Sequence, residues 1–194
     1  MAVTLRTDRL LLRRWKDADR EPFAALNADP EVMEHFPAPL SRPESDALID
    51  RIEERFDENG FGFWALEVAG TGEFIGFAGL WVPRFHAHFT PAVEIGWRLA
   101  RSAWGRGYAT EAALRALGFA FDDRALDEVV SFTSLGNVRS QAVMKRIGMS
   151  HDPSDDFDHP LVDEGHRLRR HVLWRITAAG WAAKVLPGTD VRPW

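Results

Sequence analysis

The residues with the clearest chemical use form a short glycine loop near the middle of the chain. The loop joins an apolar segment to a segment with helical spacing, and it consists of Gly105, Arg106, Gly107, Tyr108, Ala109 and Thr110. The N–H groups at a helix N-terminus have no partners within the helix, so they attract anions, and glycine lets a phosphate approach them closely. The loop therefore predicts a pyrophosphate site, although a tight turn that uses glycine only for its positive φ would explain the same residues.

Two common nucleotide-binding patterns do not account for this loop. The pattern GxxxxGK[ST] is absent from the chain, and Thr110 stands where the dinucleotide fingerprint GxGxxG needs its third glycine. The loop also follows a predicted hairpin, whereas a dinucleotide fingerprint belongs within a βαβ unit. The elements around the loop must therefore indicate which anion it binds.

Those elements predict an α/β, or mixed α+β, fold. Segments in which apolar residues have the spacing of a strand are interspersed with segments in which they have the spacing of a helix. Gly60 and Gly148 stop two of the predicted helices. The apolar runs on either side of Gly70-Thr71-Gly72 predict a hairpin. We expect strands over 4–14, 61–70, 73–82, 93–100, 129–134 and 170–177, and helices over 17–26, 41–59, within 101–121, over 137–147 and, as a turn, within 176–188.

Composition excludes several classes of function. The net charge of −5 has the wrong sign for broad binding to nucleic acid, and the absence of cysteine excludes disulfides, a cysteine nucleophile and thiolate metal sites. No stretch approaches the roughly 18 apolar residues of a membrane span, and the first residues do not form a signal peptide. We therefore expect a cytoplasmic protein with no metal, membrane or nucleic-acid partner.

Three ordered blocks carry a family resemblance. Residues 5–15, 93–112 and 133–149 read LRTDRLLLRRW, VEIGWRLARSAWGRGYATEA and TSLGNVRSQAVMKRIGM. Together they resemble the GCN5-related N-acetyltransferases (GNAT), specifically the Rim-type branch that includes ribosomal-protein N-terminal acetyltransferases, over roughly residues 5–177. The chain departs from the family's stricter pattern at Ser102, where relatives have Gln or Arg, so one side-chain anchor for the cofactor is in doubt.

The resemblance implies both a fold and a cofactor. It implies a single domain over 1–194, with a core of about 5–177 and an extension over 178–194, built on a mostly antiparallel sheet flanked by helices. Two strands would splay apart, and acetyl-coenzyme A would lie in the gap as co-substrate. The residues implied to bind it are Trp97, Arg98 and Leu99 for the pantetheine, Gly105, Arg106, Gly107, Ala109 and Thr110 for the pyrophosphate, and Asn137, which could equally be a helix N-cap.

Acetyl transfer needs a base, an oxyanion donor and a proton for the leaving sulfur. The resemblance places Glu94 beside the acetyl group as the base, a strand N–H near Trp97 at the oxyanion, and Ser140 near the thiolate. Glu94 could instead be a strand charge paired with Arg98 or another arginine, and Ser140 could be an ordinary helix serine. His86 and His88 are alternative bases in a loop, and the single tyrosine, Tyr108, is expected to pack.

The acceptor side is expected to be aromatic. The family's acceptor opening falls near Phe36, Trp64, Trp81 and Phe85, which could wall a pocket for an apolar or cationic group, or could pack in the core, as Trp64 and Trp81 inside strands suggest. The acidic segment 152–164 could attract a cationic amine or simply be a solvated loop.

The sequence and the resemblance together predict an N-acetyltransferase. The predicted acceptor is a primary amine, either a protein or peptide N-terminus or a small-molecule amine, and the protein is expected to be a monomer or a homodimer. A noncatalytic module that binds acyl-coenzyme A as a sensor is the alternative, because the acid and the base are not fixed by the sequence.

Overall fold

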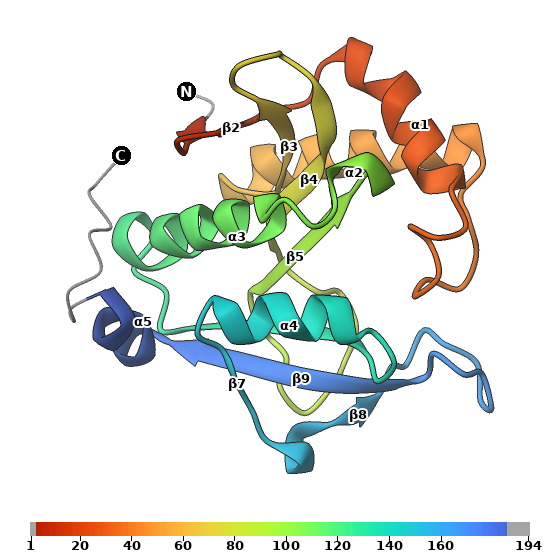
Figure 1. Ribbon diagram of the computed structural model, residues 1–194. Coiled ribbons are helices and arrows are strands. Elements are labelled where there is room, and N and C mark those ends of the chain that lie inside the picture. Colours follow the sequence, from red (N-terminus) through yellow and green to blue (C-terminus); the bar gives the residue numbers. More distant parts are fainter. Residues whose placement is uncertain (1–2, 186–194) are drawn as a thin grey trace.

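A nine-stranded sheet organises the computed structural model, which describes residues 3–185 (Figure 1). The strands follow the order β1-β2-β3-β4-β5-β6-β9-β7, and β8 also pairs with β9. Every pairing is antiparallel except that of β5 with β6. The strands are β1 Leu5–Arg6, β2 Leu10–Arg13, β3 Phe63–Val68, β4 Phe74–Trp81, β5 Glu94–Leu99, β6 Glu128–Ser134, β7 Ser150–His151, β8 Phe157–Asp158 and β9 Arg170–Thr177.

Helices flank this sheet, so the predicted fold class is confirmed. Figure 1 shows α3 and α4 side by side in front of the sheet and α2 behind it. The helices are α1 Arg20–Ala28, α2 Arg42–Asn59, α3 Tyr108–Gly118, α4 Val138–Arg146 and α5 Ala178–Val185. The strand expected over 4–14 is two short strands, and the turn expected within 176–188 is the longer helix α5. Of the predicted extension 178–194, residues 186–194 lie outside the described residues. Within 3–185, none of the helices is long and apolar enough to cross a bilayer.

The boundaries of α2 follow directly from its sequence. Ser41 and Glu44 form a capping box, in which the backbone N–H of Ser41 donates to the Glu44 carboxylate at 2.8 Å. At the other end, Gly60 adopts a left-handed φ of 75° that stops the helix. Between them, the buried side chains Ile52 and Phe56 attach the helix to the core.

The central strand β5 is held firmly on only one side. Six register pairs, from Gly76↔Leu99 to Trp81↔Glu94, join it to β4. The parallel pairing with β6 consists of the single register pair Glu94↔Val130. The Ser131 hydroxyl donates to the Ile95 carbonyl at 2.8 Å, and beyond this contact the two strands part, as the family resemblance implies.

The glycines of β4 make the tight β4–β5 pairing possible. Gly76 has φ +130°, and a Cβ there would lie 2.2 Å from the carbonyl oxygen of Arg98. We predict that Gly76→Ala lowers the free energy of unfolding by about 2 kcal/mol or more, because both the φ and the contact are unfavourable for alanine. Denaturant unfolding would measure this change. Gly70→Ala is the control, since no atom lies within 4 Å of its Cβ position; equal effects of the two substitutions would contradict the prediction.

Candidate active site

The parted edge of β5 exposes a small set of backbone groups. The N–H of Ala100 donates to Ile75 of β4 at 2.9 Å, and the N–H of Val130 of β6 donates to Val93 at 2.9 Å. Because strand backbone groups alternate between the two edges, Trp97 and Leu99 direct theirs toward β6. The Leu99 carbonyl accepts from the Trp104 indole N–H at 2.9 Å. The N–H groups of Trp97 and Leu99 and the carbonyl group of Trp97 therefore lie along the gap between β5 and β6.

The same alternation corrects the expectation for Arg98. Its register partner is Phe77 of β4, and its backbone groups point to that strand rather than to the gap. The prediction that the backbone of Arg98 contacts the pantetheine arm is therefore wrong. The side chain of Arg98 instead projects from the face of the sheet that also carries Glu94.

The glycine loop presents free N–H groups at the start of α3. Gly105 and Gly107 have φ values of 72° and 81°, which favour glycine, and Gly107 is the N-cap residue of α3. No side chain caps the helix there, so its first N–H groups remain available for an anion. Both glycines are thus needed for their backbone conformation, and the loop also keeps the geometry of a phosphate site.

An arginine far away in the sequence fastens this loop. The Arg9 guanidinium donates to the carbonyl oxygen of Arg106 at 2.9 Å and pairs with the Glu111 carboxylate at 2.5 Å. Thr7 donates to the same carboxylate at 2.5 Å, and the Arg9 guanidinium lies 4.8 Å from the centre of the Tyr108 ring. Sequence reasoning missed this clamp because no local pattern links residues about a hundred positions apart.

Asn137 and Ser140 occupy the first turn of α4. The Asn137 side chain accepts a hydrogen bond from the Ser140 N–H at 3.2 Å and donates to Thr133 at 2.9 Å. The capping interpretation of Asn137 is therefore confirmed, and one of its two amide N–H donors is engaged by Thr133. Ser140 is half-buried, and its hydroxyl has no hydrogen bond within the described residues.

The sheet register gathers a second set of side chains on one face. Glu94, Gly96 and Arg98 share a face of β5, because alternate residues of a strand point the same way. Their register partners on β4 are Trp81, Gly79 and Phe77, and Val130 of β6 pairs with Glu94. This surface, which we call the acceptor face, also carries Phe132 and Ser134 of β6 by the same alternation.

Glu94 is the carboxyl group on the acceptor face. One carboxylate oxygen lies 3.6 Å from the Cβ position of Gly96, beside the ring of Phe63, and Phe63 stacks on Trp81 at 5.1 Å. Burial among these groups raises the pKa of Glu94 to about 8. The alternative pairing of Glu94 with Arg98 or another arginine is wrong, since Arg98 donates to Asn27 and no ion pair of Glu94 occurs among residues 3–185.

The two loop histidines are less suited to the role of base. His86 and His88 are both exposed, and the His88 imidazole lies 3.5 Å from the Asp155 carboxylate. Asp155 in turn accepts from the Arg175 guanidinium at 2.7 Å. Of the sequence candidates, Glu94 is thus the titratable group that the fold places at the parted strands.

Three of the four predicted acceptor aromatics are on this side of the molecule. Trp81 adjoins Glu94, Phe36 lies with its ring centre 4.0 Å from the Arg98 guanidinium, and Phe85 contacts Phe132 with ring centres 5.7 Å apart. The prediction for Trp64 is wrong. Its side chain is fully buried on the opposite face, against Phe56 and Phe119, so the core interpretation holds.

Two histidines beside Phe85 were not identified from the sequence. The ring centres of His159 and Phe85 are 4.7 Å apart, and those of His159 and His171 are 4.9 Å apart. Burial lowers the pKa of His171 and, with His171 nearby, lowers that of His159 to about 4, so both rings are neutral. The alternation of residues 170–177 predicted a strand that contains His171. The sequence did not show the register that brings His171 beside the loop.

Three of the six acidic residues in segment 152–164 lie beside basic side chains. Asp155 pairs with Arg175, Asp156 lies 2.7 Å from the His151 imidazole, and Asp158 is 3.4 Å from the Arg170 guanidinium. Paired charges produce a weak field at a distance. The structure therefore favours the solvated-loop interpretation over attraction of a cationic amine.

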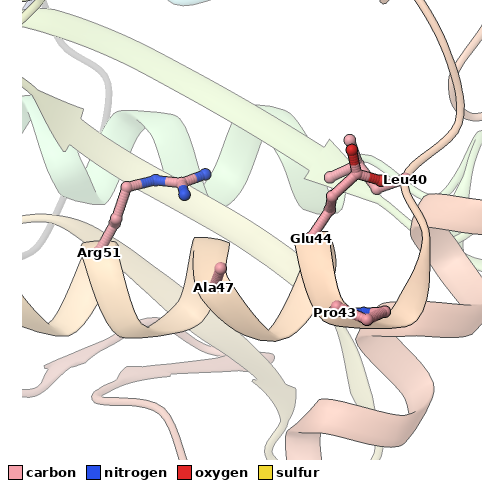
Figure 2. A pocket seen from close by; sticks show the side chains of 5 residues that line it. All are labelled: Leu40, Pro43, Glu44, Ala47 and Arg51. Atoms are coloured by element: carbon pink, nitrogen blue, oxygen red, sulfur yellow. The ribbon is translucent and has the colours of Figure 1, made fainter.

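A separate shallow pocket lies on the outer surface of α2 (Figure 2). It is lined by Leu40, Pro43, Glu44, Ala47 and Arg51, and the side chains of Glu44 and Arg51 rise from the same side of the helix. None of these residues comes from β4, β5 or α3, so this pocket does not belong to the site at the parted strands. No group of three acidic or histidine side chains that could hold a metal ion occurs within residues 3–185.

Comparison with known proteins identifies the arrangement. A family model described as an acetyltransferase (GNAT) domain matches residues 9–150. The chain belongs to the GNAT acetyltransferase family. It is therefore an acyltransferase, and the acetyl-coenzyme A that the family uses suits the free backbone groups of the gap and the glycine loop.

Individual relatives agree with this assignment. The chain is 30% identical over 98% of its length to an Aspergillus fumigatus protein named FsC-acetyl coenzyme A-N(2)-transacetylase, of which it covers 83%. An acetyltransferase structure from Agrobacterium tumefaciens is 30% identical, with a TM-score of 0.72 and coverage of 91% of this chain and 95% of that one. RimL, a ribosomal alpha-N-protein acetyltransferase solved in complex with coenzyme A, is 13% identical, with a TM-score of 0.72 over 90% of this chain and 98% of its own, and shares the fold.

The glycine loop gives a direct test of cofactor placement. We predict that Gly107→Ala weakens binding of coenzyme A at least tenfold, because a side chain at φ +81° would distort the N–H groups that precede α3. Isothermal titration calorimetry would measure the dissociation constant. Gly165→Ala is the matched control, since Gly165 has φ +79° with no atom within 4 Å of its Cβ position. Equal affinity of the Gly107 variant and the parent would contradict the placement.

Proposed function

We propose that this protein transfers the acetyl group of acetyl-coenzyme A to a primary amine, either a small-molecule amine or the N-terminus of a peptide. The observation that carries the proposal is the half-buried Glu94 at the point where β5 and β6 part, which forms no ion pair with any other residue of 3–185. The name of the Aspergillus relative, which gives acetyl coenzyme A and a nitrogen, N(2), supports the same donor and the same kind of acceptor atom.

The chain's own groups divide the binding work. The gap-facing N–H and carbonyl groups of Trp97 and Leu99 pair with the amides of the pantetheine arm, in the manner of an added strand. The N–H groups of residues 105–110 bind the pyrophosphate, and Arg9 holds this loop in position through Arg106 and Glu111. Bound acetyl-coenzyme A supplies a thioester whose acetyl carbon an amine can attack.

Three groups serve the chemical step. Glu94 accepts the proton that the amine must lose, and a carboxyl group with a pKa near 8 is basic enough for this purpose. A backbone N–H of the parted edge near Trp97 donates to the carbonyl oxygen on which negative charge develops. The half-buried hydroxyl of Ser140 is the proton donor for the leaving sulfur.

A thiol-release assay tests the function. Purified protein is incubated with acetyl-coenzyme A and a panel of primary amines, and the thiol that forms is followed with a colorimetric reagent. The protein contributes no background because it contains no cysteine. Turnover with at least one amine is expected. Tight binding of acetyl-coenzyme A without turnover on a broad panel would contradict the proposal and favour the noncatalytic sensor.

The pH dependence tests the role of Glu94. With an arylamine acceptor, which carries no proton near neutral pH, we predict that kcat/KM rises as pH increases through about 8, because Glu94 becomes the carboxylate there. Glu94→Gln should lower kcat/KM by about 10² to 10⁴ and remove this rise. Glu73→Gln, at an exposed position, should leave both unchanged. A Glu94 variant with the parent's pH profile would exclude Glu94 as the base.

A further inference from the structure

Arg98 is a cation on the acceptor face with no carboxylate partner among residues 3–185. Its guanidinium donates one hydrogen bond there, to the side-chain oxygen of Asn27 at 2.5 Å, and its Nε is buried without a partner. Arg13 shows the ordinary arrangement, since its guanidinium contacts both Asp19 and Glu67 at 2.7 Å. An arginine has five donors, so Arg98 keeps most of its hydrogen-bonding capacity unused.

The surroundings of Arg98 orient the guanidinium without neutralising it. The centres of the Phe36 and Phe77 rings lie 4.0 and 5.4 Å from it. Asn27 is fully buried and donates to Ser45 at 2.9 Å, so the amide that accepts from Arg98 is itself fixed between α1 and α2. Burial lowers the pKa of Arg98 only to about 10, which leaves it charged at neutral pH.

Arg98 also stands on the same face as the base. Glu94 and Arg98 are four residues apart on β5, which places their Cα atoms about 13 Å from each other. Gly96 lies between them, and the Phe63 ring, 3.2 Å from the Cβ position of Gly96, borders the space between the two side chains. Near pH 7 Glu94 is largely protonated, so Arg98 makes this part of the acceptor face positive.

We propose that Arg98 binds a carboxylate carried by the acceptor, so that the substrates are amines that also bear a carboxylate group. The inference rests on the proposed function and narrows its class of acceptor. A guanidinium presents a planar pair of donors that matches the two oxygens of a carboxylate. The carboxylate can belong to a free amino acid or to an acidic side chain beside a peptide N-terminus.

Matched acceptor pairs test this specificity. One pair is an amino acid and its amide, and the other is a peptide with Asp in second place and the same peptide with Asn. We expect kcat/KM to favour the carboxylate member of at least one pair by about tenfold or more. The pair that shows the preference identifies whether the carboxylate comes from an amino acid or from a peptide.

Variants then assign the preference to Arg98. Arg98→Gln should bring the ratio near one, because it should raise KM for the carboxylate member more than for the neutral member. Arg98→Lys, which keeps the charge but loses the planar fork, should retain part of the preference and guards against a misfolded Gln variant. Arg51→Gln, which removes a charge on α2, should leave the ratio unchanged.

Binding distinguishes failure of this inference from failure of the proposed function. In the presence of coenzyme A, calorimetry should show that the carboxylate amines bind the parent more tightly than Arg98→Gln. Acetylation of amines with a ratio near one in every pair, or a preference that survives in Arg98→Gln, would overturn the inference alone. Carboxylate binding that depends on Arg98 without any acetylation would overturn the proposed function and support the carboxylate site.

Discussion

The unequal pairing of β5 is the constraint on which the site depends. Its edge toward β4 is closed by six register pairs, while its edge toward β6 is joined around Glu94, by one register pair and by hydrogen bonds to the carbonyl groups of Val93 and Ile95. An open strand edge inside a protein leaves backbone groups that need partners, and such groups are costly to bury unsatisfied. The edge at Trp97 and Leu99 is thus suited to an extended ligand with amides of its own. Because β4 holds β5 rigidly, the gap can remain open without loss of the sheet.

Burial gives the acceptor face its chemical character. The aromatic side chains around Glu94 raise its pKa, and the same kind of environment keeps His159 and His171 neutral. The surface therefore contains groups whose charge depends on local desolvation rather than on ion pairs. Arg98 is the exception, because a guanidinium stays charged even when burial lowers its pKa. A titratable carboxyl group and a fixed cation consequently occupy one strand face.

Sequence patterns predicted those parts of the molecule that depend on neighbouring residues. The stop signal of α2 at Gly60, the β3–β4 hairpin and the glycine loop all follow from local chemistry. The face on which a strand residue lies depends on register, and a shift of one residue reverses it. Trp64 was placed on the wrong side for this reason, and the β-bulge between Leu66 and Glu67 shows that the period of two is interrupted in that hairpin. Arg98 shows the same limitation. Its backbone groups point toward β4, while its side chain projects from the acceptor face.

The three sequence blocks that carried the family resemblance meet in space around the glycine loop. The first block supplies Arg9, which binds the carbonyl of Arg106 and the carboxylate of Glu111 in the second block. The third block supplies Asn137, whose amide caps α4, and α4 packs beside α3. A helix N-terminus binds an anion well only when its N–H groups are held in place. The three blocks therefore position the glycine loop together. Arg9 of the first block holds the loop, and α4 of the third block packs against α3, the helix that follows the loop.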